Sequence, residues 1–121
     1  MSRVRKPLIE TRIIFRTAAT ERGRMKKGYW VVAYRSISDG SAVKAYASLA
    51  IPVIESFGGR LLTGPMSQVE PHEAGMRQLT IVVEFESYDR AVVAYKSEAY
   101  KKALDALGSG AERDFRIVEG V

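Results

Sequence analysis

Two side chains in this sequence have the chemistry to move a proton near neutral pH. His72 is the only histidine, and imidazole is the usual general base at that pH. Glu84 is the one carboxylate inside an otherwise apolar run, and a partly buried carboxylate is a common acid or base. Each also has an ordinary structural role. His72 is then an exposed turn residue, and Glu84 pairs with a basic side chain such as Arg35 or Arg116.

Amphipathic aromatic side chains give a second kind of chemistry, the lining of a binding pocket. The chain concentrates Tyr29, Trp30, Tyr34, Tyr46, Tyr95 and Tyr100 in what we expect to be one strand and two helices. Packed between helices and sheet, such rings form an apolar cavity with hydroxyl groups for a planar ligand, although core packing explains most of them equally well. The side chains predicted to contact a ligand are Trp30, Tyr34, Tyr46, His72, Glu84 and Tyr95.

Other types of site do not fit the composition. The chain has no cysteine, which excludes disulfides and thiolate chemistry, and one histidine is too few for a typical transition-metal site. The glycines at 58–59 and 108–110 lack the spacing of a phosphate-binding or dinucleotide-binding loop, and we interpret them as helix stops. No metal and no cofactor are therefore predicted, and no set of catalytic residues is evident.

Four segments have the apolar pattern of strands. Residues 29–34 are almost continuously apolar, which is typical of a central strand covered on both faces. Residues 60–69 suit an edge strand interrupted by Gly64 and Pro65. Residues 79–85 alternate apolar and mixed side chains, and 115–118 form a short final strand.

Two amphipathic helices separate these strands. The first begins after Asp39, a good N-cap, and ends at Gly58-Gly59. Pro52 lies inside it and is expected to bend the helix or locally break its backbone hydrogen bonds. Its buried stripe is Val43, Tyr46, Ala47, Ala50, Val53, Ile54 and Phe57. The second begins after Ser87 and can be capped again midway at Ser97. Its predicted buried side is Ala91, Val92, Tyr95, Ala99, Ala103, Leu104 and Leu107.

The order strand, helix, strand, strand, helix, strand predicts an α+β fold of the ferredoxin-like type. This βαββαβ arrangement has a four-stranded antiparallel sheet, with the first and third strands central and two helices on one face. Two helices leave the other face open, and the first strand is apolar on both faces. A second copy of the chain is the simplest cover, so we predict a homodimer through the sheet face.

Residues 1–24 differ from the rest of the chain in charge. They carry seven basic and two acidic side chains, which accounts for the whole net charge of +5. We therefore divide the chain into a basic extension, 1–24, outside the fold, and a domain over 25–121. Translation starting at Met25 is the favoured interpretation, with an organelle transit peptide or an added strand over 8–15 as alternatives.

Because this charge lies outside the domain, the basic composition does not indicate nucleic-acid binding. No stretch approaches the roughly 18 consecutive apolar residues of a membrane span, and no secretion signal is recognisable. We expect a cytoplasmic protein with no nucleic-acid or membrane partner.

Several short segments, taken in order, resemble domain-of-unknown-function family 1330. They are Gly28-Tyr29-Trp30-Val31-Val32-Ala33-Tyr34, Gly58-Gly59-Arg60-Leu61, Val83-Glu84-Phe85-Glu86-Ser87, Tyr95-Lys96-Ser97-Glu98-Ala99-Tyr100 and Ile117-Val118-Glu119-Gly120. The resemblance implies a dimeric α+β barrel, a superfamily that also contains cofactor-independent monooxygenases, haem-degrading enzymes and lactone isomerases. The chain departs from the family at Leu62-Thr63-Gly64-Pro65, where an arginine tends to precede a glycine pair, and at Glu98, where proline is common.

Three functions remain open from the sequence. The first is a small homodimeric domain that binds an apolar or aromatic ligand between sheet and helices. The second is a cofactor-independent monooxygenase or isomerase that uses tyrosines with His72 or Glu84 for proton transfer. The third is a structural or interaction dimer, which a tightly filled interior would favour. An enzyme requires an ionisable group with a perturbed pKa inside a closed pocket.

Overall fold

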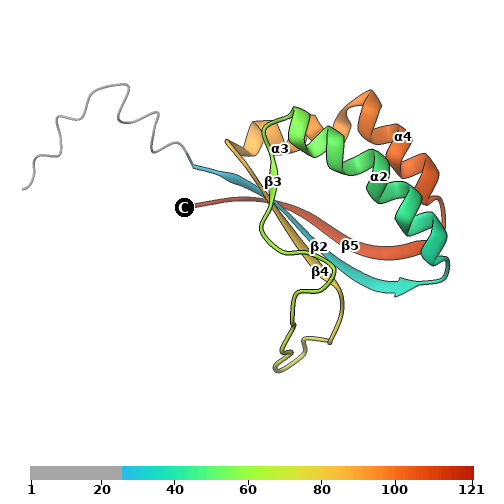
Figure 1. Cartoon of the computed structure of the whole chain (residues 1–121). Helices are drawn as coiled ribbons and strands as arrows, with labels where there is room; N and C mark the ends of the chain where they lie inside the picture. Colours follow the sequence, from blue (N-terminus) through green and yellow to red (C-terminus); the bar gives the residue numbers. More distant parts are fainter. Residues whose placement is uncertain (1–25) are drawn as a thin grey trace, which may run out of the picture.

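The computed structural model describes residues 26–121, which form one sheet with helices on one of its faces (Figure 1). The predicted extension 1–24 lies outside the described residues. In chain order the elements are β2 (Gly28–Ile37), α2 (Gly40–Ser56), β3 (Arg60–Leu61), β4 (Thr80–Phe85), α3 (Tyr88–Lys96), α4 (Glu98–Leu107) and β5 (Ala111–Glu119).

The sheet has the predicted topology. Its strand order is β3-β4-β2-β5, so the first and third strands of the fold are central and the second and fourth are at the edges. β2 pairs antiparallel with both neighbours, and Val31 lies opposite Val82 on β4 and Arg116 on β5. The prediction of a four-stranded antiparallel α+β fold is confirmed.

Helix α2 has the predicted start and stop. The Asp39 carboxylate accepts hydrogen bonds from the backbone N–H groups of Ser41 and Ala42, which satisfies donors that a helix start leaves free. At the other end Gly58 has a φ of +79°, a conformation that glycine adopts without strain. The helix assignment continues through Pro52, so the proline does not break α2.

The second predicted helix is two helices in the structure. Ser97 is both the C-cap of α3 and the N-cap of α4, and its hydroxyl accepts from the backbone N–H of Tyr100. This break changes the phase of the buried stripe. Tyr100 is fully buried and Ala99 is exposed, whereas a continuous helix was predicted to bury Ala99. Residues 26–121 therefore contain three helices.

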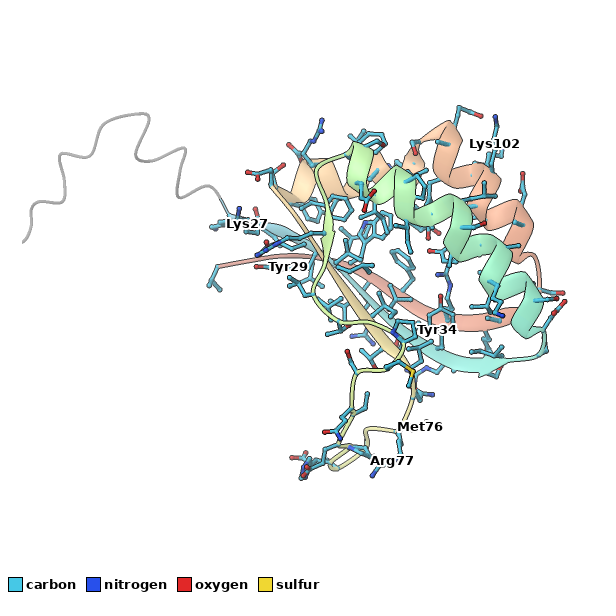
Figure 2. All side chains as sticks on the ribbon, in the orientation of Figure 1. Lys27, Tyr29, Tyr34, Met76, Arg77 and Lys102 are labelled. Carbon is cyan, nitrogen blue, oxygen red and sulfur yellow. The ribbon has the colours of Figure 1, made fainter. Side chains whose placement is uncertain are left out.

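The strands differ in length from the prediction, most clearly at the edges. β3 pairs through only two residues, Arg60 and Leu61, while β5 begins at Ala111, well before the expected start at Phe115. Residues 62–79 form a long connection that extends away from the sheet (Figure 1). Met76 and Arg77 lie on it (Figure 2). The chain does not extend the edge strand there because Gly64 and Pro65 disfavour regular pairing.

An aromatic core fills the space between sheet and helices. Trp30 on β2 is 1% exposed and donates its indole N–H to the Ala91 carbonyl over 2.8 Å. The rings of Phe85, Tyr100 and Phe115 have their centres 5.0, 5.0 and 5.2 Å from the Trp30 ring. These tilted and edge-to-face arrangements are favourable for aromatic pairs. This packing holds in place the inner face of the sheet, which forms one wall of the pocket.

None of the helices in residues 26–121 has the length and apolar character that crossing a bilayer requires.

Candidate functional site

A pocket of about 120 Å³ lies between the inner face of the sheet and helix α2. The strands contribute side chains at alternate positions, which is why one face of the sheet lines it. The lining comprises Trp30, Val32, Tyr34, Val43, Tyr46, Ala47, Ala50, Ile51, Ile54, Leu61, Pro65, Leu79, Ile81, Val83 and Arg113. Most of these side chains are aliphatic or aromatic, so the pocket suits an apolar body.

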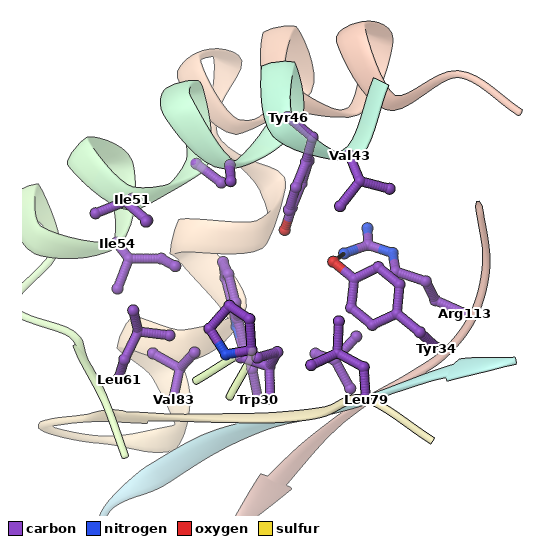
Figure 3. Close-up of a pocket in the computed structure, with 15 residues that line it drawn as sticks. Trp30, Tyr34, Val43, Tyr46, Ile51, Ile54, Leu61, Leu79, Val83 and Arg113 are labelled. Atoms are coloured by element: carbon purple, nitrogen blue, oxygen red, sulfur yellow. Dashed lines mark hydrogen bonds between the residues drawn. The ribbon is translucent and has the colours of Figure 1, made fainter. Parts of the chain in front are cut away.

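The two ends of the pocket differ chemically. Figure 3 shows Ile51, Ile54 and Leu61 at one end and Tyr34 and Arg113 at the other. Ile51 and Leu61 are 40% and 43% exposed, so the apolar end reaches the protein surface. The other end carries a hydroxyl and a guanidinium group. The pocket therefore combines an apolar entrance with a polar, positively charged end.

Arg113 is held in place by aromatic rings. Its guanidinium carbon lies 4.6 Å from the centre of the Tyr46 ring, 5.2 Å from that of Phe115 and 5.5 Å from that of Tyr34. All three distances are within the range of cation–π attraction. The rings restrict the side chain from several sides and leave its N–H groups as the polar feature of this end.

The hydrogen bonds of Arg113 within the described chain are long. Nη1 lies 3.4 Å from the Tyr34 hydroxyl oxygen and Nη2 lies 3.5 Å from that of Tyr100, against about 2.9 Å for a well-formed bond. Burial alone would lower the pKa of Arg113, but the nearby Tyr46 and Tyr100 oxygens outweigh this and raise the pKa. The guanidinium therefore stays charged.

Tyr46 and Tyr100 form a buried hydroxyl pair with 2.6 Å between their oxygens. Either hydroxyl can be the donor in this pair, and the Tyr100 oxygen also accepts from Arg113. Burial raises the pKa of Tyr100, and the Tyr46 contact adds to this. Burial also raises the pKa of Tyr34, against the opposing effect of Arg113. Tyr34 and Tyr100 consequently keep their protons at neutral pH.

This cluster of Tyr34, Tyr46, Tyr100 and Arg113, named here the Arg113 cluster, offers hydrogen-bond donors and positive charge. Among the described residues that line the pocket there is no carboxylate and no histidine. The cluster can stabilise negative charge on an oxygen atom, since preorganised donors in a site shielded from water do this best. It lacks a group suited to removing a proton at neutral pH.

Three of the six predicted ligand contacts meet in the pocket. Trp30 and Tyr34 come from the inward positions of β2 on either side of Val32, and Tyr46 reaches the sheet from α2. Figure 3 shows the Tyr46 hydroxyl pointing from the helix toward the sheet.

The other three predicted contacts do not line this pocket. His72 lies on the connection between β3 and β4, exposed, with its Nε2 2.7 Å from the Glu70 carboxylate. Glu84 lies on the outer face of the sheet and accepts from Arg60 over 3.0 Å. Its partner is therefore Arg60, while the suggested partners Arg35 and Arg116 both contact Asp114.

Tyr95 packs in the core rather than against the cavity. Its ring centre lies 4.9 Å from that of Phe115 and 5.1 Å from that of Tyr100. Tyr95 therefore supports two members of the aromatic wall around the Arg113 cluster without contacting the pocket itself.

Arg113 is the charged residue of the pocket lining, and the sequence does not predict it there. The predicted final strand begins at Phe115 and so leaves Arg113 outside it. The sequence contains a signal for its position, because Arg113 precedes Phe115 and Ile117 by steps of two and so shares their face of an extended strand.

Within residues 26–121 no group of three potential metal ligands occurs.

Fold and pocket together define a class, the ferredoxin-like α+β domains with a cavity between sheet and helices. The chain belongs to the family described as Domain of unknown function (DUF1330), whose match covers residues 27–121. Comparison with curated proteins gives no significant match.

Solved structures of low sequence identity share the fold. A protein of unknown function from Rhodopseudomonas palustris is 17% identical, with 93% of this chain and 95% of that chain covered and a TM-score of 0.59. An ethyl tert-butyl ether d (ethd) family protein from Bacillus halodurans is 10% identical, covers 78% of this chain and 99% of its own, and has a TM-score of 0.51. At these identities the likeness concerns the fold alone.

Proposed function

We propose that this protein binds a small apolar or aromatic ligand in the pocket between the sheet and α2. The observation that carries the proposal is an apolar cavity of about 120 Å³ with an exposed rim at Ile51 and Leu61 and a polar end at Arg113. This volume is of the same order as the apolar cavity of about 150 Å³ that binds benzene, and the exposed rim allows a ring-sized body to extend beyond the pocket. Trp30, Tyr34 and Tyr46 contact the ligand.

The single tryptophan of the chain makes the binding test direct. Trp30 lines the pocket, so we expect its fluorescence to change saturably on titration with benzoate or benzamide, two aromatic probes of matched shape. Ala47→Phe places a ring in the pocket and should abolish the change. Ala45→Phe, at an exposed position of the same helix, should not. Absence of a saturable response to both probes would contradict the proposal.

Catalysis of the cofactor-independent monooxygenase or isomerase type is the alternative. The observation in its favour is the Arg113 cluster, whose donors are suited to an oxyanion. Against it, the described lining supplies no base, since His72 and Glu84 lie elsewhere. An enzyme would convert its ligand, so a native ligand recovered unchanged after prolonged incubation with the protein in air supports binding. A recovered product favours catalysis.

The second part of the proposal is a homodimer formed through the outer face of the sheet. Tyr29, Val31 and Ala33 of β2 are half-buried there although no helix of residues 26–121 covers that face. Ion pairs flank this apolar centre, with Arg35 2.8 Å from Asp114 and Arg60 3.0 Å from Glu84. An apolar centre with a charged rim is typical of protein interfaces.

Light scattering at micromolar concentration tests the dimer. We expect twice the monomer mass for the unaltered protein and the monomer mass for Val31→Asp, which places a charge at the centre of the face. Val93→Asp is the matched control, because Val93 is exposed on α3, and it should remain a dimer. A monomeric unaltered protein would remove this part of the proposal.

A further inference from the structure

Arg113 carries a positive charge that no acidic side chain of residues 26–121 neutralises by an ion pair. Two carboxylates adjoin it in the chain: Glu112 is exposed, and Asp114 lies on the outer face of the sheet, where it contacts Arg35 and Arg116. Neighbouring β5 residues alternate between faces, so Arg113 faces the pocket and Asp114 does not. A half-buried cation without a counterion is costly unless an anion joins it.

The donor capacity of Arg113 is also largely unused. A guanidinium group has five N–H donors in a planar fork. Within the described chain its hydrogen bonds to the hydroxyls of Tyr34 and Tyr100 are long, and the Tyr46 hydroxyl is a third neighbour. The fork geometry matches the two oxygens of a carboxylate. The aromatic rings around Arg113 hold the fork in position before any ligand arrives, which reduces the ordering cost of binding.

The rest of the pocket restricts what can be attached to that anion. Its volume is about 120 Å³, and the wall between the Arg113 end and the rim at Ile51 and Leu61 is apolar (Figure 3). One unneutralised positive charge suits one negative charge, so a dianionic phosphate monoester would bring an excess charge into an apolar space.

We propose that the ligand is a small monocarboxylate with a ring-sized apolar body, whose carboxylate binds the Arg113 fork. Its body then lies against Trp30 and Ile54. This inference rests on the proposed ligand-binding function and names the chemical class that the pocket selects. Tyr34 donates a further hydrogen bond to the carboxylate and gains a well-placed acceptor in return.

The test compares three probes on the full chain by Trp30 fluorescence and by calorimetry. Benzoate and benzamide have nearly the same shape and differ in charge, while phenyl phosphate supplies the competing anion. We expect benzoate to bind at least about tenfold more tightly than benzamide, from the strength of hydrogen bonds to charged groups. Phenyl phosphate should bind more weakly than benzoate.

Arg113 variants assign the preference to this side chain. Arg113→Gln should remove the benzoate preference, whereas Arg113→Lys should keep part of it because it keeps the charge without the fork. The matched control is Arg116→Gln, on the same strand but on the outer face, which should leave the preference unchanged. Thermal melting of each variant shows whether it is folded, so that loss of the contact is distinguished from unfolding. The comparison of probes on the unaltered protein does not depend on any variant.

The outcomes distinguish the two proposals. Equal affinity for benzoate and benzamide, or a benzoate preference that survives in a folded Arg113→Gln protein, overturns the carboxylate assignment while the pocket remains a binding site. Tighter binding of phenyl phosphate than of benzoate also overturns it. No binding of any probe overturns both the assignment and the binding function.

Discussion

The hydroxyl oxygens of Tyr46 on α2 and Tyr100 on α4 lie 2.6 Å apart in the protein interior. This contact joins two helices, and it also brings Arg113 of β5 to the same point, since the Tyr100 oxygen accepts from that guanidinium. With Tyr34 of β2, the polar end of the pocket is therefore assembled from four elements of the fold. A change to either tyrosine should affect both helix packing and the Arg113 cluster.

Tyr100→Phe should lower the free energy of unfolding by about 1 to 3 kcal/mol, because it leaves the buried Tyr46 hydroxyl and Arg113 short of a partner. Urea unfolding monitored by circular dichroism measures this loss. A double-mutant cycle with Tyr46→Phe should show a coupling energy of about 0.5 to 3 kcal/mol. Strict additivity of the two changes would mean that the hydroxyl contact contributes nothing.

Alkaline pH should destabilise the protein through Tyr100. Burial raises its pKa in the folded state above the ordinary tyrosine value of about 10. Below pH 10 both states hold the proton and the contribution to stability is complete. Above it the unfolded state releases the proton first, so the unfolding free energy falls as pH rises, by up to about 1.4 kcal/mol per pH unit for this group. Denaturant unfolding between about pH 9 and about pH 11 should show a smaller fall in Tyr100→Phe, and an identical fall would contradict this origin.

Trp30→Ala should cost about 3 to 5 kcal/mol of unfolding free energy, the usual range for removing a buried large aromatic ring. The same change removes the indole donor to the Ala91 carbonyl. Leu49→Ala is the comparison, because Leu49 is 43% exposed and its truncation should alter stability by no more than about 0.5 kcal/mol. Equal losses in the two variants would argue against a core role for Trp30.

Ser97→Ala should lower stability by about 1 kcal/mol, the typical value for loss of an N-cap. Its hydroxyl accepts from the Tyr100 backbone N–H and donates to the Ala94 carbonyl over 2.8 Å. Ser48→Ala serves as a control, since that exposed serine lies inside α2 and bonds back to Ala45. Thermal melts of the two variants compare them directly. No difference between them would mean that the break between α3 and α4 does not depend on the cap.

Much of the fold followed from local chemistry. Asp39 and Ser87 mark helix starts because their side chains bond free backbone donors, and Gly58 marks a stop because glycine tolerates a positive φ. The sequence predicts Ser97 as a possible second cap, but it does not predict how the break changes which side chains are buried. A break shifts the helix phase by an amount that depends on packing, so the buried position moved to Tyr100.

Periodicity and capping act over a few residues, so they were enough to predict the order of the elements and the helix caps. They do not specify which face of β2 lines the pocket or which polar groups meet there. Arg113 reaches Tyr34 and Tyr100 because β5 pairs beside β2 beneath α4, and no local pattern specifies such a contact. The same pairing leaves His72 and Glu84 outside the pocket, since side chains from distant segments are placed by sheet register and helix packing rather than by their own residue type.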